Sequence, residues 1–533
     1  MTALQASLAL STPDAYNPFN GGCVATSSFG DCTPSSQVAI DAISTELTRV
    51  SRTTLTMADF KVSRPDLIEL PGGPLGVAFG VEFRHETQSD DRDADLDGTN
   101  VFTDQIDGRV SVSNLSAVSS NPDTEGERDV SSAYLEFAVP VVSPEMRIPL
   151  VHNLEFQVAG RYEHYSDFGD VAKPKIAMAL DIVEGLRLRA SYSQGFRAPN
   201  LEQTNATTYS RLATTNDYLR CEADLRAGRI ATFNACAQSV SYSLLVSGNP
   251  DLKPEESTNQ SVGLVFQPRF LPEAFGDLTF TVDRWRIQQE DIVGLIGGQT
   301  AVVQEYLARL TGSSNPNVVR AAPNSDDVAF FTGTGIAPVG LIQTVSDRFV
   351  NLLPQDVQGV DFAVMWRLRD TPWGNFSAQV NVAQLLEFNR DAGPTVQALD
   401  AARSAGQINV ATPLPITSDL LARNGRPEWK ASSTLTWSQG PFQVGAFVQY
   451  TSAVDETGFL STTGTPWVVE AQTTANLYFQ YDYEGSGPAA DTRLRVGLRN
   501  ITDEAPPLSS SGYLGSLYRP YGRYWHASIT KTF

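Results

Sequence analysis

The sequence predicts an all-β protein, a transmembrane antiparallel β-barrel built from one continuous sheet. Three observations predict it. Apolar and polar residues alternate along many segments, these segments are long enough to cross a bilayer, and short turns alternate with long loops along the chain. A length of 533 residues would suit several ordinary domains, but large barrels run as a single sheet of this size.

Residues 75–84 show the alternation most plainly. Their odd-numbered positions are Leu, Val or Phe, and their even-numbered positions are Gly, Ala, Glu or Arg. The same division recurs in residues 154–158 and 493–499. Because successive side chains of a strand point to opposite faces, each segment has one apolar and one polar face. In a membrane barrel the apolar face meets lipid and the polar face lines the lumen.

The strands and their connections support the membrane assignment. About fifteen such segments occur, each roughly 10 residues or longer, which is close to the length of a tilted membrane strand. Counted back from a periplasmic C-terminus, every short turn lies on one side and the longest loops lie on the other. A soluble all-β protein predicts no such separation, and no repeat of propeller-blade length is present. The short turns are near 183–185, 370–374 and 438–440, and the long loops are near 89–129, 197–257, 291–342, 389–427 and 501–522.

Charge and composition exclude several classes. The formal net charge of -21 argues against a nucleic-acid partner, which requires a basic surface. No stretch of 18 apolar residues occurs, so an α-helical membrane span is not expected. Residues 1–10 lack the basic region and the apolar run of a signal peptide, so an exported protein of this kind is expected to have lost its true N-terminus.

The four cysteines form two local pairs in polar stretches, which favours two disulfides, Cys23–Cys32 and Cys221–Cys236, and an oxidising compartment. Zinc binding is the alternative. Neither pair has the CxxC spacing of zinc sites, and no histidine lies near either pair in sequence.

Three segments resemble TonB-dependent receptors of the outer membrane. The run YSQGFRAP at 192–199 resembles the end of a strand in these receptors, and NPDLKPEEST at 249–258 resembles the segment that follows it. The tail is similar to the closing region of the family, with RNITD at 499–503 and YGR at 521–523 before a terminal strand. The three matches occur in the family's order.

The resemblance covers essentially the whole chain and implies a barrel of about 22 strands in full-length members. Residues 1–533 would form the C-terminal part of such a barrel, with residues 1–43 as an external loop and residues 44–533 as strands and loops. The signal peptide, TonB box and plug domain of these receptors do not fit ahead of Met1. A truncated fragment that lacks the plug and roughly seven strands is therefore expected.

The resemblance also implies a function and a location. The protein would lie in the outer membrane of a Gram-negative bacterium and take up a scarce nutrient, namely a ferric siderophore, a corrinoid or an oligosaccharide. The TonB–ExbB–ExbD complex would drive uptake through a plug and TonB box, and the other partners would be outer-membrane lipids and the small nutrient ligand. Two alternatives stay open: a passive porin-like channel or adhesin barrel, and a soluble carbohydrate-binding β protein.

Two candidate sites carry weaker signals. Arg197 and Pro199 match the family most sharply, and a structural role at the end of a strand is favoured over ligand contact because arginine pairs readily with carboxylates. Residues 93–104 (DADLDGTNVFTD) fit a calcium-loop pattern, but position twelve is Asp104 rather than glutamate and the flanks predict strands rather than helices. A solvated acidic loop is the simpler interpretation, so no metal site is assigned.

Enzyme activity is not expected. The sequence contains no GxSxG motif, phosphate-binding glycine loop or dinucleotide fingerprint. No serine or aspartate motif accompanies the four isolated histidines, His85, His152, His164 and His526. No catalytic residue, cofactor or ligand-binding residue is assigned.

The last ten residues, YWHASITKTF, predict a membrane strand that ends on Phe533. Trp525, Ala527 and Ile529 would face lipid, while His526 and the Ser and Thr residues would face the lumen. Lys531 breaks the pattern but can extend its amine to the membrane surface. In a complete barrel this strand would pair with the first strand, so in this chain it is expected to be an unpaired edge.

Overall fold

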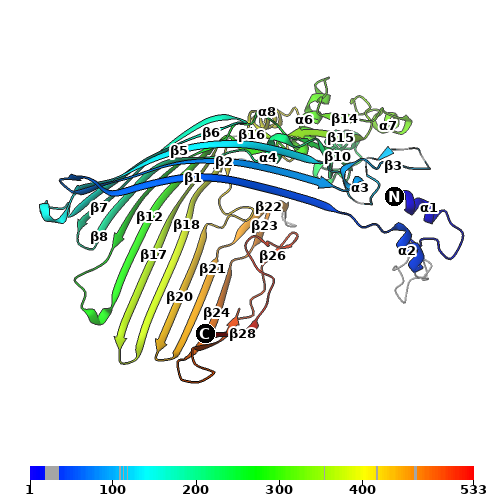
Figure 1. Ribbon diagram of the computed structural model, residues 1–533. Coiled ribbons are helices and arrows are strands. Elements are labelled where there is room, and N and C mark those ends of the chain that lie inside the picture. Colours follow the sequence, from blue (N-terminus) through cyan, green and yellow to red (C-terminus); the bar gives the residue numbers. More distant parts are fainter. Residues whose placement is uncertain are drawn as a thin grey trace.

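In the computed structural model, long strands follow one another in a single curved antiparallel sheet, and the loops gather at one end of it (Figure 1). The structure describes residues 1–18, 35–106, 108, 110–111, 113–116, 118–352, 354–415, 418–460 and 465–532. Within these residues the sheet has sixteen strands, of which β19 pairs only beside β18 and the other fifteen run in chain order. The count of about fifteen membrane strands is confirmed.

Those fifteen strands form the wall of the molecule. They are β1 (Arg49–Leu70), β2 (Gly73–Arg92), β5 (Thr124–Val142), β6 (Asn153–Tyr165), β7 (Gly169–Val183), β8 (Leu186–Arg197), β11 (Glu255–Phe266), β12 (Asp277–Glu290), β17 (Gln355–Thr371), β18 (Gly374–Arg390), β20 (Trp429–Gln439), β21 (Phe442–Thr451), β24 (Gln472–Tyr483), β25 (Thr492–Arg499) and β28 (Tyr524–Lys531).

The register across the wall separates polar from apolar side chains. Glu82 pairs with Ser132, which pairs in turn with Glu163, so these polar residues form one row on the same face. The neighbouring row, which begins with Val81 and Ala133, lies on the opposite face. We call the polar face the inner face. A one-residue slip would exchange the two rows, so the alternation fixes the register.

The connections separate into two sides, with one exception. Turns of two residues close β1–β2, β7–β8, β17–β18 and β20–β21 at the end opposite the loops. The turn at 166–168, between β6 and β7, is also short, with three residues, but lies on the loop side, so the expectation that every short turn lies on one side was wrong there. Gly169 follows this turn with a φ of 96°, a conformation that glycine adopts without strain. The longest connections on the loop side are 93–123, 198–254, 291–354 and 391–428.

The loops contain short elements of their own. The helices are α1 (Thr2–Leu8), α2 (Gln37–Ile43), α3 (Ala94–Asp97), α4 (Leu201–Asn205), α5 (Tyr218–Arg226), α6 (Gly298–Leu310), α7 (Ser325–Phe331) and α8 (Pro394–Ser404), with 3-10 turns at Pro144–Met146, Phe233–Ala235 and Glu273–Phe275. The loop strands are β3 (Phe102–Thr103), β4 (Val110–Ser111), β9 (Tyr209–Asn216), β10 (Ser239–Ser247), β13 (Ile292–Gly294), β14 (Val318–Arg320), β15 (Ile342–Arg348), β16 (Val350–Leu352), β19 (Ser418–Asp419), β22 (Val454–Leu460), β23 (Pro466–Val469), β26 (Leu508–Ser509) and β27 (Gly512–Tyr513). None of the helices in the described part of the chain is long and apolar enough to cross a membrane.

The two ends of the wall are β1 and β28. Among the described residues, β1 pairs only with β2, and β28 pairs only with β25. His526 lies opposite Gly497 in the inner row, as the alternation of the last strand predicts, while Phe533 lies outside the described residues. The wall begins at Arg49, and Gln5 of α1 donates a hydrogen bond to Asp104 on the loop side.

Candidate functional site

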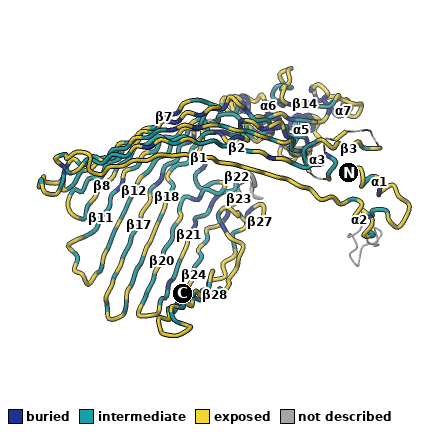
Figure 2. Tube along the Cα trace, in the orientation of Figure 1, coloured by how far each residue is buried: buried dark blue, intermediate teal, exposed yellow. Residues whose placement is uncertain are grey.

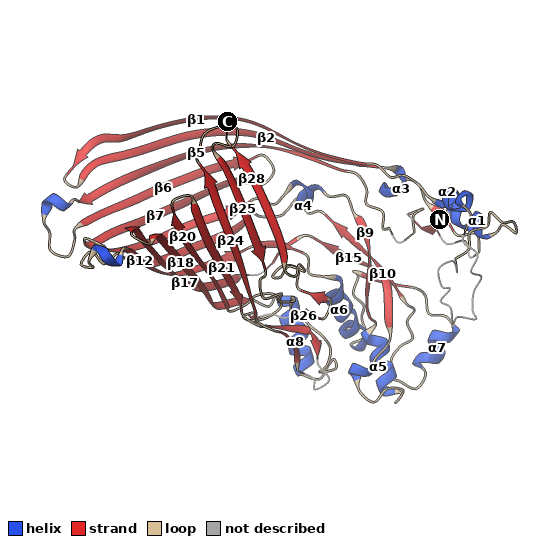
Figure 3. Ribbon diagram, turned by 90° about the horizontal axis from the view of Figure 1, so that it is seen from below, coloured by secondary structure: helices blue, strands red, loops and turns tan. Residues whose placement is uncertain are grey.

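Three external loops, 198–254, 291–354 and 391–428, fold together into one compact structure, which we call the loop body (Figure 3). Its centre is a four-stranded sheet in the order β14, β15, β10, β9. β10 comes from the first loop and β15 from the second, and the two strands pair in parallel from Ser243 with Thr344 to Ser247 with Arg348. Backbone hydrogen bonds therefore join loops that are distant in sequence.

The loop body has its own hydrophobic core. Tyr306 of α6, Phe331 of α7 and Leu219 of α5 are at most 2% exposed, and Leu399 of α8 brings the third loop into the same cluster. Buried residues gather here and are sparse along the wall (Figure 2). Burial raises the pKa of the Tyr306 phenol above its usual range, and its hydroxyl donates to Glu222 at 2.8 Å. The loop body is therefore packed like a small soluble domain.

Buried charges lie within this core. Asp217 and Glu305 are fully buried, and the Arg320 guanidinium lies between them. Its two terminal nitrogens donate to Asp217 at 2.6 and 3.0 Å, and its Nε donates to Glu305 at 3.3 Å. Burial lowers the pKa of Arg320, but Asp217 and Glu305 outweigh burial and hold that pKa above its usual value. Arg309 adds a hydrogen bond to Glu305 at 2.6 Å, so the charges neutralise one another.

A second ion pair connects α5 to α7. Arg220 donates to the Asp327 carboxylate and to the Val339 carbonyl. Asn324 caps α7, and its N–H donates to Asp327 at 3.0 Å. That backbone hydrogen bond first, and Arg220 second, lowers the pKa of the Asp327 carboxyl.

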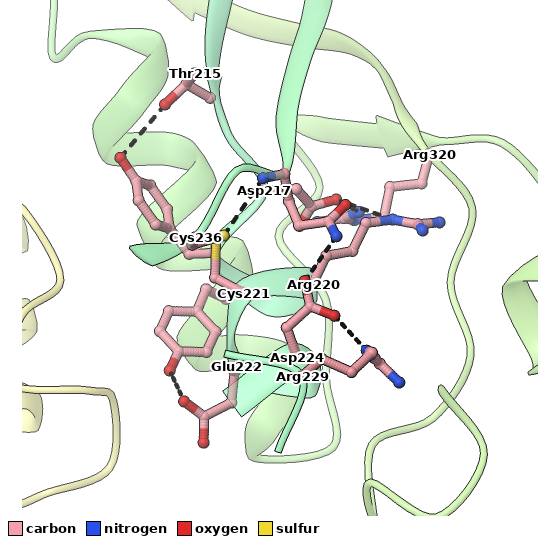
Figure 4. Close-up of a disulfide and its surroundings, with 12 residues drawn as sticks. Thr215, Asp217, Arg220, Cys221, Glu222, Asp224, Arg229, Cys236 and Arg320 are labelled. Carbon is pink, nitrogen blue, oxygen red and sulfur yellow. Dashed lines mark hydrogen bonds and ion pairs between the residues drawn. A yellow bond between two sulfur atoms is a disulfide. The ribbon is translucent and has the colours of Figure 1, made fainter. Parts of the chain in front are cut away.

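A disulfide joins Cys221 of α5 to Cys236, with Cα atoms 5.4 Å apart, beside Asp217, Arg220 and Arg320 (Figure 4). It closes the segment that leads from α5 to β10. Both partners are those that the spacing of the cysteines favours. The other predicted pair, Cys23–Cys32, lies outside the described residues.

The two motif segments contact each other where the loop body meets the wall. Arg197 ends β8 and lies opposite Glu255, the first residue of β11. The guanidinium donates to Glu255 Oε1 at 2.5 Å, and the same oxygen accepts the Val293 N–H at 2.8 Å. Asn249 donates to the Phe349 carbonyl and so connects its own loop to the next one. These contacts support a structural role for Arg197 at the end of β8.

The inner face near the loops carries a network of ion pairs. Arg84 lies 3.4 Å from Glu163, and Arg128 lies 2.7 Å from Glu86. Arg128 also donates to the carbonyl of Pro199 at 2.8 Å, and this hydrogen bond holds the backbone of Pro199 in place. Most charged groups of this region already have partners, which leaves few of them available to a ligand.

Two carboxylates of the acidic loop at 93–104 accept hydrogen bonds from within the loop. Asp93 caps α3 by accepting the Asp95 N–H at 3.0 Å, and Asp97 accepts the Thr99 N–H at 2.6 Å. Across the residues that the structure describes, no three His, Cys, Asp or Glu side chains gather into a group that could hold a metal ion. His85 lies on β2, His164 on β6 and His526 on β28, while His152 directly precedes β6. His85 and His164 pair with the surface carboxylates of Asp129 and Asp170.

A wall of tilted amphipathic strands with long structured loops on one side defines an outer-membrane β-barrel of the receptor kind. Residues 4–501 match the family described as TonB dependent receptor-like, beta-barrel. The chain belongs to this family, whose members are transporters of the outer membrane and not enzymes.

Known relatives support the same assignment. Over 141 residues, which are 26% of this chain and 15% of the relative, the chain is 26% identical to the probable TonB-dependent siderophore receptor PirA of Acinetobacter baumannii. The crystal structure of the siderophore receptor PirA from that species has a TM-score of 0.54 at 16% identity, and the match covers 90% of this chain and 55% of that one. A ferric enterobactin receptor mutant, PfeA from Pseudomonas aeruginosa in complex with enterobactin, has a TM-score of 0.55 at 15% identity, with coverage of 91% and 55%. The chain thus spans about half the length of these solved receptors.

Proposed function

We propose that this chain forms the wall and the external loops of an outer-membrane receptor that takes up a scarce nutrient with energy supplied through TonB. The observation that carries the proposal is the family match over residues 4–501, which spans both the wall and the loop body. The loop body supports it, because a packed assembly of three loops can present a preformed binding surface outside the membrane.

The cargo classes that suit this function are a ferric siderophore, a corrinoid and an oligosaccharide. Analogy alone points to a siderophore, since one relative is a probable siderophore receptor and PfeA was solved in complex with enterobactin. We also propose that coupling runs through the TonB–ExbB–ExbD complex, by way of a plug and TonB box of the complete receptor.

Uptake by cells tests the proposal. A strain that lacks the protein is compared with a complemented strain for uptake of a labelled ferric siderophore, a labelled corrinoid and labelled oligosaccharides. The expected result is uptake of one class that requires the protein, requires TonB and stops when the proton gradient is dissipated. Uptake that persists without TonB would instead favour a passive porin-like channel, and no uptake of any class would contradict the proposal.

A further inference from the structure

A polar cavity lies under the last external loop. Its volume is about 440 Å³, and it is enclosed by the loop-side ends of β21, β24 and β25 and by residues 500–523. This cavity is separate from the loop body and from the ion-paired inner face near β5 to β8. It therefore requires its own explanation.

Inner-row amides and hydroxyls project from the strands into the cavity. Gln449 pairs with Thr474, and Thr451 pairs with Gln472, so the four side chains share the inner face. Within the described part of the chain, the side chains of Gln449 and Thr474 form no hydrogen bond, whereas Gln472 donates to the Ala505 carbonyl at 3.0 Å. Two polar side chains are thus free to bind hydroxyl groups of a ligand.

Two tyrosines of the last loop and strand add an aromatic surface. The rings of Tyr521 and Tyr524 lie 6.2 Å apart at 74°, and Tyr521 is 66% exposed. Arg499 lies 6.0 Å from the Tyr524 ring, and Arg519 also lines the cavity. Neither arginine forms an ion pair among the described residues. Rigid aromatic faces beside hydrogen-bonding side chains suit rings that carry C–H groups on their faces and hydroxyls on their edges.

The cavity is held in shape by the fold. Asn500 is 7% exposed, accepts the Glu504 N–H at 2.9 Å and donates to the Glu504 carbonyl at 2.8 Å. Tyr518 is 2% exposed and packs in a small core with Val454 and Val469 of the β22–β23 hairpin. Since these contacts fix the loop, little ordering is required when a ligand binds.

The charges of the residues that line the cavity limit the class of ligand that can bind there. Among the described residues that line it, Glu504 is the single carboxylate, and Arg499 and Arg519 add donors for hydroxyl or acidic oxygens. The cavity therefore does not suit a cationic ligand. Resting on the proposed uptake function, we infer that this cavity is a recognition subsite for a polyhydroxylated ring ligand, that is, for a glycan segment.

Paired variants test this inference. Gln449→Ala and Tyr521→Ala remove one hydrogen-bonding group and one aromatic face from the cavity. Their matched controls are Gln443→Ala, an inner-row glutamine of the same strand nearer the turn, and Tyr513→Ala, a tyrosine of the same loop outside the lining. Heat-modifiable migration first establishes that all four variants fold.

Binding is measured by calorimetry on the full chain in detergent, with maltooligosaccharides, xylooligosaccharides, oligogalacturonates and a ferric tris-catecholate as probes. We expect one oligosaccharide series to bind, each cavity variant to weaken it about tenfold, and each control to stay within about twofold. The inference is overturned if no oligosaccharide binds, or if cavity and control variants behave alike. Binding of the ferric catecholate alone would overturn this inference and leave the proposed receptor function intact. The proposed receptor function is contradicted only if cells take up no nutrient class.

Discussion

Arg197 and Glu255 face each other across β8 and β11 and form an ion pair at the point where the wall meets the loop body. The two side chains differ in their exposure to solvent. The Arg197 side chain is 69% exposed, whereas that of Glu255 is 8% exposed and also accepts the Val293 N–H. Glu255 therefore joins three segments of the chain, while Arg197 contributes a partly solvated charge.

This asymmetry predicts unequal costs. Glu255→Ala leaves the buried Val293 N–H without its acceptor and should destabilise the loop attachment by about 1–3 kcal/mol. Arg197→Ala should cost no more than about 1 kcal/mol, because the Arg197 side chain is largely solvated and Glu255 keeps the Val293 N–H. The measurement is the rate of protease cleavage in residues 291–354 of the folded protein. Equal cleavage rates in the two variants would contradict the prediction.

Loss of Arg320 should disrupt the loop body severely. Arg320→Met leaves Asp217 and Glu305 buried without their shared cation, which we expect to cost about 3–5 kcal/mol. Arg309→Met is the matched control, since Arg309 contacts the same Glu305 but its side chain is one-third exposed. Hydrogen exchange of β14 and β15 amides should increase strongly in the first variant and little in the second. A similar increase in both variants would show that burial of Arg320 is not decisive.

The disulfide should stabilise the loop body and leave the wall unaffected. For a loop of 15 residues, replacing both Cys221 and Cys236 by serine should cost about 3 kcal/mol. We expect faster protease cleavage between these positions and unchanged heat-modifiable migration of the barrel. Reduction of the disulfide in the unmodified protein should accelerate cleavage in the same way. Cleavage at the original rate would contradict the prediction.

The cap of α7 should weaken in acid. Because folding lowers the pKa of Asp327, its contribution is fully present above its unfolded pKa, near 3.9, and is lost as the pH falls through the folded value. Protection of α7 amides from hydrogen exchange should therefore fall below about pH 4. Asp327→Asn should remove this pH dependence, whereas Asp326→Asn should retain it. Parallel curves for both variants would assign the titration to another group.

The alternation of residue types predicted the wall because it is a local property of each strand. It correctly placed Gly497 and His526 on the inner face. Pairing of Arg197 with a carboxylate was also expected from its residue type. The identity of that partner was not predictable, because the β8–β11 register brings Glu255 there from 58 residues away. The loop body was missed for the same reason. Asp217 and Arg320 lie 103 residues apart, and no periodicity marks their contact.

A close contact between strands gives the last prediction. Gly497 lies in the inner row against the His526 ring, and a Cβ at this glycine would lie 2.1 Å from the ring carbon Cε1. Gly497→Ala must therefore displace the ring and should destabilise the junction of β25 and β28 by about 1–3 kcal/mol. Gly160→Ala is the matched control, because a Cβ there meets nothing within 4 Å. The measurement is the urea midpoint of unfolding in lipid. His526→Ala combined with Gly497→Ala should restore most of the loss, since the clash involves the ring itself, and an unrestored midpoint would show that the glycine is required for another reason.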